Sequence, residues 1–150
     1  MATLELYVNN EDSTGAWTTV GSAPYLGIQD QPTNYIYSIT RNSNSGVYSF
    51  TNSGKTSETI TSVYLYIYAY GVASSNFTTI LNATDTGLGC PTSWGWVNVN
   101  VSSILTTWAE IDAVTMYFDR PNTSNDAGVD AAYLYVTYEG LVPKVYITHQ

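Results

Sequence analysis

The stretch Val63-Tyr64-Leu65-Tyr66-Ile67-Tyr68-Ala69-Tyr70 alternates an aliphatic residue with a tyrosine. Side chains on a β-strand point alternately to opposite faces of the sheet. One face of this strand therefore carries aliphatic side chains, which suit a core, and the other carries tyrosines. The alternation predicts a strand over Ile60–Tyr70 that separates a hydrophobic core from an outer tyrosine surface.

Two later segments, Ala113–Asp119 and Ala131–Tyr138, show the same alternation. In each of them, core-type side chains occupy one set of positions and tyrosines occur in the other set. We therefore expect a sheet that presents tyrosines outward and forms an interface or ligand face. The predicted face comprises Tyr64, Tyr66, Tyr68, Tyr70, Tyr117, Tyr133 and Tyr135.

Short segments of strand-forming residues separated by turn residues also fill the rest of the chain, which predicts an all-β sandwich of about nine or ten strands. We expect Asn9–Gly15 to be a polar loop, and Ser102–Glu110 to hold one helical turn capped by Ser102 or Ser103. Residues 1–140 form the predicted sandwich, and residues 141–150 are a C-terminal extension of the same domain. The remaining predicted strands are Leu4–Val8, Trp17–Val20, Asn34–Ile39, Gly46–Asn52, Asn76–Ala83, Trp94–Val101 and, as a strand or extended tail, Lys144–Thr148.

The composition excludes several classes of partner. The net charge is −8, and the chain has only four Lys and Arg residues. A nucleic-acid-binding protein needs a basic surface to displace counterions, so nucleic acid is not an expected partner. Anionic membranes are disfavoured for the same reason, and no apolar run reaches the roughly 18 residues that span a bilayer.

The sequence offers little for catalysis. His149 is the only histidine, which removes Ser–His–Asp, Cys–His and multi-histidine zinc sites. The acidic pairs Glu110/Asp112 and Asp126/Asp130 have the residue types of a glycosidase site. Twelve acidic residues produce such pairs by chance, however, so we expect no enzymatic activity.

A calcium ion is a possible ligand, because calcium takes carboxylate, carbonyl and amide oxygens. The candidate positions are Asp30 with Asn34, or Asn10 with Asp12. The alternative is that these residues simply favour turns, since Asn and Asp hydrogen-bond to their own backbone. No other cofactor is expected.

Trp94 and Trp96 lie on one face of an alternating segment, and Val97, Val99 and Val101 lie on the other. Exposed tryptophans on a strand would make a possible sugar platform, whereas buried ones would pack the core or anchor a loop. The tyrosine surface has similar alternatives. We expect protein–protein contact there, with sugar stacking as the rival and burial within the chain as a third possibility.

The order of segments resembles the jelly-roll sandwich of tailed-phage and related virus surface proteins. Gly15-Ala16-Trp17-Thr18, the acidic stretch leading to Tyr35, and the strand Ile60–Ile67 carry the first part of the resemblance. Trp108–Ile111 with the paired strands Val114–Asp119 and Tyr133–Tyr138 carries the rest. The same architecture is also similar to carbohydrate-binding modules.

The resemblance implies a virion structural protein, a capsid-decoration or fibre subunit that forms homo-oligomers and packs on a capsid, fibre or other structural protein. Its expected location is the virion surface, or the extracellular space if the chain is not viral. The first alternative is a carbohydrate-binding module or adhesin that binds a surface glycan. The second is an extracellular filament subunit, which would donate one terminal strand to the next copy. In the virion subunit, Ala2–Val8 and Lys144–Gln150 are the segments expected to extend a neighbour's sheet by strand addition.

Overall fold

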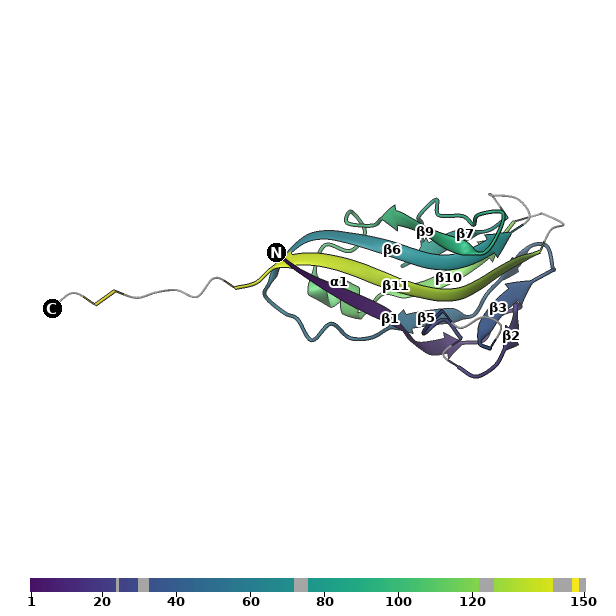
Figure 1. The fold of residues 1–150 in the computed structure, drawn as a ribbon, viewed down its shortest axis with the longest axis horizontal. Coiled ribbons are helices and arrows are strands. Elements are labelled where there is room, and N and C mark those ends of the chain that lie inside the picture. The colour runs from purple at the N-terminus through teal and green to yellow at the C-terminus, as the bar shows by residue number, and fades with distance from the viewer. Residues whose placement is uncertain (24, 30–32, 72–75, 122–125, 142–146, 149–150) are drawn as a thin grey trace.

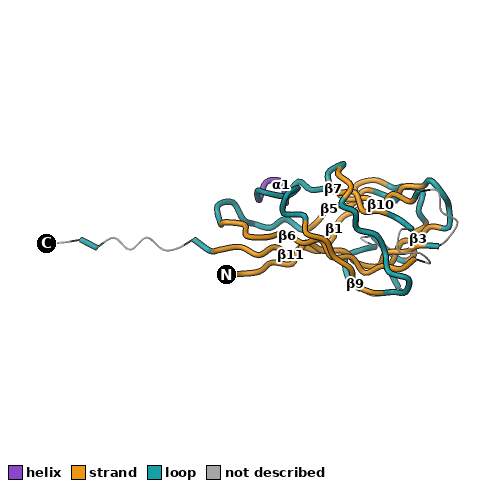
Figure 2. Tube along the Cα trace, turned by 90° about the horizontal axis from the view of Figure 1, so that it is seen from above, coloured by secondary structure: helices purple, strands orange, loops and turns teal. Residues whose placement is uncertain are grey.

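The chain folds into a two-layer β-sandwich with one short helix (Figure 1), in a computed structural model that describes residues 1–23, 25–29, 33–71, 76–121, 126–141 and 147–148. Eleven strands lie in these described residues. The all-β jelly-roll sandwich expected from the sequence is therefore confirmed. Figure 2 shows the two layers edge-on, with β7, β5 and β10 in one layer and β6, β11 and β9 in the other.

The first sheet is built around the two longest strands, which pair with each other along almost their whole length. All of its neighbouring strands are antiparallel. The strands lie in the order β9 (Gly95–Asn100), β6 (Thr59–Gly71), β11 (Ala127–Glu139), β3 (Tyr35–Ser38) and β2 (Thr18–Val20), and the first half of β1 (Ala2–Ser13) lies beside the second half of β11.

The second sheet begins with the other half of β1, which leaves β11 at Tyr7 and pairs with β5 from Val8 onward. One strand therefore belongs to both sheets and closes one edge of the sandwich. The strands that follow are β5 (Val47–Phe50), β10 (Thr115–Arg120), β7 (Thr78–Leu81) and β8 (Thr84–Asp85), with the short β4 (Ser43–Asn44) also paired to β10.

The core lies between the sheets and uses the aliphatic side of each alternating strand. Val63, Leu65, Ile67 and Ala69 of β6 are fully buried, whereas the tyrosines between them are half-buried. Side chains from β10 complete the core from the second sheet, and Phe118 is also fully buried. The alternation of aliphatic residues and tyrosines in Val63–Tyr70 therefore sets which side of β6 faces inward.

A loop residue fills the space between β3 and β1 along the edge of β11. The pairing of β11 with β6 shifts register between Val129 and Ala131. Just beyond this bulge, the Ala132 amide donates to the carbonyl of Leu26 at 3.1 Å, and the Leu26 side chain is fully buried. The segment containing Leu26 therefore completes the sheet edge where no strand is present among the described residues.

Several local predictions were wrong. The predicted loop Asn9–Gly15 is strand as far as Ser13, because β5 supplies a partner for these polar residues. The helix α1 (Trp108–Asp112) begins later than expected, and its cap is Thr107. The Thr107 side chain accepts from the Glu110 amide at 3.2 Å, and the Glu110 carboxylate accepts from the Thr107 amide, which makes a capping box.

The strand addition expected of the N-terminus stays a prediction. Ala2–Tyr7 pairs along one edge with β11 of its own chain. The C-terminal prediction, Lys144–Thr148, falls largely outside the described residues, which include only Ile147 and Thr148 of it. Within the described part of the chain, no helix is long and apolar enough to cross a membrane.

Candidate functional site

A continuous array of aromatic rings covers the outer side of the first sheet, and we call it the aromatic face. Ten of its members are linked by ring contacts with centroid separations between 4.5 and 6.2 Å. The rings come from β1, β3, β6, β9, β11 and the residue before β9. The ten are Tyr7, Tyr35, Tyr37, Tyr66, Tyr68, Tyr70, Trp94, Trp96, Tyr133 and Tyr135.

One row of rings crosses three strands because their registers coincide. Tyr133 of β11 pairs with Tyr66 of β6 on one side and with Tyr7 of β1 on the other. Its ring stacks on both, at 5.0 Å from Tyr66 and 4.8 Å from Tyr7. Trp96 of β9 meets the edge of the same ring at 5.3 Å. Tyr133 is therefore the hub of this row.

A second group of rings lies toward the other end of β6. Trp94 contacts Tyr68, Tyr70 and Tyr35, with a separation of 4.5 Å from Tyr70. The ring of Tyr70 lies directly over Gly128 of β11, where a Cβ atom would collide with it. The glycine thus allows this ring to approach β11 closely. Trp96 joins the two groups by contacting Tyr68 at 5.3 Å.

The structure brings together most, but not all, of the residues expected on this face. Tyr64, Tyr66, Tyr68 and Tyr70 all lie outward on β6, and Tyr64 pairs with Tyr135 of β11. The placement of Tyr117 was wrong. This residue lies on β10 in the second sheet, because the same alternation occurs in strands of both layers.

Trp94 and Trp96 lie on the same face as the tyrosines, which the sequence treated as two separate surfaces. Trp96 is the more open of the two tryptophans, with 40% of its surface exposed, and Trp94 is half-buried. Val97 and Val99 point to the other side and pack against the core, as the alternation predicts. The pairing register of β9 with β6 places the tryptophans beside the tyrosines, since Trp96 pairs with Tyr68.

The sequence did not predict three members of the aromatic face. Tyr7 alternates with the buried Leu6 and Val8, and Tyr35 and Tyr37 flank the buried Ile36. The local signal was therefore present in both segments. It shows only that these rings point away from the core, and their place beside Tyr133 and Trp94 depends on long-range pairing.

Burial and one carboxylate shape the electrostatics of the ring row. Burial raises the pKa of Tyr133 to about 12, with a further contribution from the Glu5 carboxylate. Burial, followed by the charge of Glu5, also raises the pKa of Tyr7. Tyr7 and Tyr133 are therefore neutral hydrogen-bonding groups at physiological pH.

Two asparagine side chains of β9 lie along the border of the aromatic face. Asn98 and Asn100 are exposed and pair with Tyr66 and Tyr64 of β6, so they lie beside the outward tyrosines. The Asn100 side chain accepts from the Ser102 amide at 2.9 Å, which fixes its position. The aromatic face thus has donors and acceptors along one margin.

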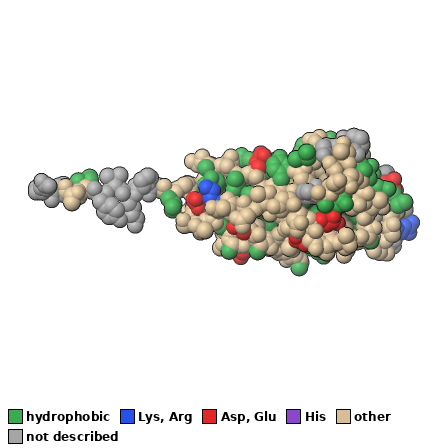
Figure 3. All heavy atoms as spheres, turned by 90° about the horizontal axis from the view of Figure 1, so that it is seen from below, with side chains coloured by type: hydrophobic (Ala, Val, Ile, Leu, Met, Phe, Trp, Pro, Cys, Tyr) green, Lys and Arg blue, Asp and Glu red, His purple; other side chains and the backbone are tan. Residues whose placement is uncertain are grey.

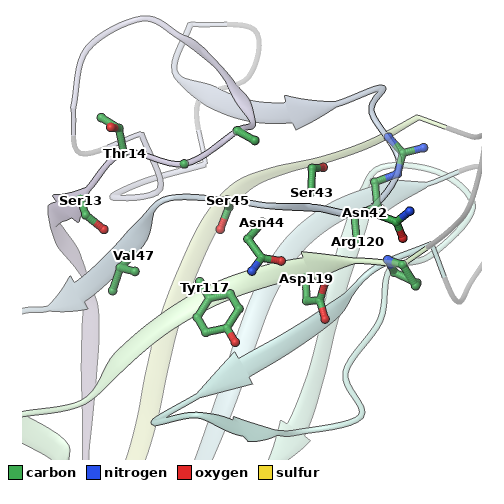
Figure 4. A pocket seen from close by; sticks show the side chains of 13 residues that line it. Ser13, Thr14, Asn42, Ser43, Asn44, Ser45, Val47, Tyr117, Asp119 and Arg120 are labelled. Carbon is green, nitrogen blue, oxygen red and sulfur yellow. The ribbon is translucent and has the colours of Figure 1, made fainter.

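The second sheet carries a different kind of surface, a groove of about 670 Å³ beside β4 and β10 that is lined by both polar and apolar side chains (Figure 4). Figure 4 shows Tyr117, Asp119 and Asn44 side by side, with Ser13 and Thr14 across the groove. Tyr117 therefore contributes to this groove instead of the aromatic face. Figure 3 shows that acidic side chains are scattered over the face seen from below and that Lys and Arg lie near its ends.

The possible calcium positions stay predictions. Asp30 lies outside the described residues, and the side chain of Asn34 accepts from the Ser22 amide at 2.8 Å. The Asn10 side chain donates to Asp12, whose carboxylate also accepts from the Ser49 hydroxyl at 2.9 Å. In the described part of the chain, no three His, Cys, Asp or Glu side chains gather in a way that could hold a metal ion.

Two of the acidic residues considered for catalysis, Glu110 and Asp112, have structural partners. The Glu110 carboxylate accepts from Thr106 and Thr107 at the start of α1, and Asp112 accepts from the Ser53 amide at 2.7 Å. Cys90 is buried, and burial raises the pKa of its thiol, so it is poorly suited to be a nucleophile. His149 lies outside the described residues.

Comparison with known proteins gives likenesses in solved structures. No family model and no curated protein sequence matches the chain. The CBM36-1 domain of a multidomain xylanase from the hindgut metagenome of Trinervitermes trinervoides is 12% identical, with a TM-score of 0.48, and the match covers 93% of this chain and 100% of that one.

A family 35 carbohydrate-binding module from an environmental isolate is 16% identical, with a TM-score of 0.44, over 98% of this chain and 100% of that one. Both identities are low, and neither likeness carries an argument about what this chain binds. The virion role expected from the sequence stays a prediction.

Proposed function

We propose that this chain is a non-catalytic carbohydrate-binding module that holds a neutral glycan chain on its aromatic face. The observation that carries the proposal is the continuous array of half-buried Tyr and Trp rings across β1, β11, β6 and β9, with Trp96 standing most open to solvent among its tryptophans. The rest of the chain serves as a rigid support for this array.

Aromatic rings suit sugars for a simple electrostatic reason. The face of an aromatic ring is negative and attracts the slightly positive C–H groups on the apolar side of a pyranose. Tyrosine adds a hydroxyl at the tip of the ring, which exchanges hydrogen bonds with sugar hydroxyls. Asn98 and Asn100 extend this polar supply along the edge of the face.

The rings are also held in place before any ligand arrives. Tyr66, Tyr133 and Tyr7 support one another by stacking, and Tyr70 rests on Gly128. Rigid aromatic side chains lose little conformational entropy on binding, so more of the contact energy remains for affinity. Low charge across the chain, at 11% charged residues, favours a neutral glycan over an ionic one.

The direct test is binding to polysaccharides. Affinity electrophoresis in gels containing xylan, glucomannan, xyloglucan or mixed-linkage β-glucan, with pull-down on cellulose and chitin, should show retardation or capture by at least one of them. Trp96→Ala should weaken that binding about tenfold, because it removes the most open tryptophan ring of the array. Trp96→Phe keeps a ring and should retain much of the affinity.

Thr84→Ala supplies the control, since Thr84 is exposed on β8 at the edge of the second sheet, far from the aromatic face in the strand order. It should bind as the wild type does. The proposal fails if no polysaccharide retards the protein, or if Trp96→Ala binds as well as Thr84→Ala.

A second candidate function is protein contact through the same face, in line with the virion or filament role expected from the sequence. The observation that favours it is the breadth of the face together with the edge strand β9, which pairs with β6 alone among the described strands. Tyr and Trp are enriched at protein interfaces, and an open strand edge accepts a further strand.

Mass measurement in solution separates the two functions. Self-association through this face predicts a concentration-dependent dimer or larger species that Trp96→Ala weakens. A wild-type protein that stays monomeric over a wide concentration range and binds a glycan supports the carbohydrate function. An oligomer that ignores every glycan supports the protein-contact function.

A further inference from the structure

The groove on the second sheet presents hydrogen-bonding groups that the fold itself does not use. Among the described residues, no hydrogen bond, ion pair or ring contact engages the side chains of Asn42, Asn44, Tyr117 or Asp119. The inward hydroxyls behave differently. The Ser43 hydroxyl donates to the Thr40 carbonyl at 2.8 Å, so its hydrogen is already used in a bond within the protein.

The floor of the groove is held firmly. The Ser45 amide donates to the Phe118 carbonyl at 2.9 Å, and the Ser45 hydroxyl accepts from the Phe118 amide at 2.8 Å. The Trp17 indole donates to the Ser43 carbonyl at 3.2 Å from below. These bonds fix β4 against β10, and therefore fix the open side chains of Asn44 and Asp119, which pair across the two strands.

Two glycines bring the far wall close to this floor. A Cβ atom at Gly15 would collide with the backbone of Ser45 and Gly46, and one at Gly46 would collide with the carbonyl of Ser13. The close approach lets the Ala16 amide donate to the Asn44 carbonyl at 2.8 Å. The groove is thus preformed, as ligand sites usually are.

We infer that this groove is a second carbohydrate site, which takes a single neutral sugar unit, free or at a chain end. Its volume of about 670 Å³ is ample for a single sugar unit and lies in the usual range of ligand sites. Tyr117 offers a ring for the apolar side of the sugar, and the Asp119 carboxylate accepts from neighbouring hydroxyls. The amides of Asn42 and Asn44 both donate and accept.

The charges of the lining select against an anionic sugar. Asp119 is half-buried in the groove wall, and its carboxylate repels a second negative charge. Arg120 follows it in sequence, but its side chain is fully buried and donates to the Ser38 carbonyl at 2.7 Å. The guanidinium group is therefore committed to the protein interior, and the ligand faces a carboxylate.

Two sites on opposite sheets would let one molecule bridge two glycan chains. This consequence rests on the proposed function, because it requires the aromatic face to bind a glycan as well. The groove site itself does not depend on it, since the groove shares no residue with the aromatic face.

Amide chemical shifts of the isotope-labelled full chain test the groove site directly. The probes are D-glucose, D-galactose, D-mannose and D-xylose, with D-glucuronate as the anionic sugar. At least one neutral sugar should shift the amides of Asn42, Asn44 and Asp119 in a saturable manner. D-glucuronate should bind about tenfold more weakly than that sugar, or not at all.

Two variants examine the groove and one examines the aromatic face. Asp119→Asn is nearly isosteric, and Tyr117→Thr keeps a strand-forming residue, so both should fold, as circular dichroism will show. Each should weaken the neutral sugar about tenfold. Trp96→Ala should leave the groove shifts unchanged.

The inference is overturned if none of the four neutral sugars shifts these amides, if both groove variants respond as the wild type does, or if D-glucuronate binds most tightly. Loss of the groove response with polysaccharide binding intact removes the second site and leaves the proposed function standing. A groove response without polysaccharide binding keeps the groove site and removes the proposed function of the aromatic face.

Discussion

The two outward surfaces of the sandwich are stabilised by different kinds of contact. On the first sheet, rings from several strands support one another, and Tyr133 touches Tyr7, Tyr66 and Trp96. On the second sheet, Tyr117 has no ring contact among the described residues, and its surroundings are shaped by backbone hydrogen bonds and close-packed glycines.

This difference shows how one side-chain type acquires two roles. A tyrosine inside an array stabilises the fold and forms part of a broad surface, so its removal affects both. A tyrosine at the wall of a groove is available to a ligand and is almost dispensable to the fold. Paired substitutions on the two sheets therefore test whether the distinction holds.

The largest expected contrast is between Tyr133→Ala and Tyr117→Ala. Removing Tyr133 deletes three ring contacts from a half-buried position and should lower the free energy of unfolding by about 2–3 kcal/mol. Removing Tyr117 should cost less than about 1 kcal/mol, because no ring packs on it. Urea denaturation of both variants measures the difference.

Tyr133→Phe is the matched control, since it keeps the ring and should stay close to the wild type in stability. Equal losses for the two alanine variants would mean that the ring contacts contribute nothing beyond the burial of each side chain. The distinction between the sheets would then be wrong.

A smaller contrast is expected between two glycines, one behind each surface. A Cβ atom at Gly15 collides with backbone atoms of Ser45 and Gly46, whereas one at Gly128 collides mainly with the side chain of Tyr70, which yields more readily than backbone. Gly15→Ala should therefore cost about 2 kcal/mol and Gly128→Ala about 1 kcal/mol in unfolding free energy.

The two glycine variants should also differ in binding. Gly128→Ala displaces the Tyr70 ring and should weaken a glycan held on the aromatic face, with the groove unaffected. Gly15→Ala moves the groove wall and should weaken only the single-sugar site. A Gly15→Ala protein as stable as the wild type would show that the loop adjusts freely and that the groove is not preformed.

Local alternation was sufficient to predict the fold class and the orientation of individual strands. The inward Leu65 and outward Tyr66 could be assigned from sequence because aliphatic residues and tyrosines alternate in neighbouring positions, as side chains do along a strand. The same pattern cannot say which sheet a strand joins. Tyr117 and Tyr133 occur in similar segments, yet their strands lie in opposite layers.

Long-range register decided the rest of the candidate sites. Tyr7 joins the aromatic face because β1 pairs with the second half of β11, and nothing near Tyr7 in sequence shows this. The groove needs β1, β4 and β10 to meet, and its glycines read in sequence only as turn residues. Ring contacts and grooves between distant segments are properties of tertiary structure.

The smallest expected effect concerns ionisation on the aromatic face. The pKa of Tyr133 is raised to about 12, chiefly by burial, and Glu5 adds to this shift. A raised pKa in the folded state means that the neutral ring is the form that folding favours. Stability from this source is therefore complete below the ordinary tyrosine pKa of about 10 and is lost as the pH rises toward 12.

Glu5→Gln removes the charge and keeps the shape of the side chain. It should lower the pKa of Tyr133 by about a few tenths of a unit, because an exposed carboxylate acts through water-screened electrostatics. Ultraviolet titration of tyrosinate in wild type, Glu5→Gln and Tyr133→Phe measures the change, and the step assigned to Tyr133 should vanish in Tyr133→Phe. A Tyr133 that titrates at the ordinary tyrosine pKa of about 10 would show that its ring is well solvated, and the stacked row on the first sheet would then be no more closely packed than the surroundings of Tyr117 on the second.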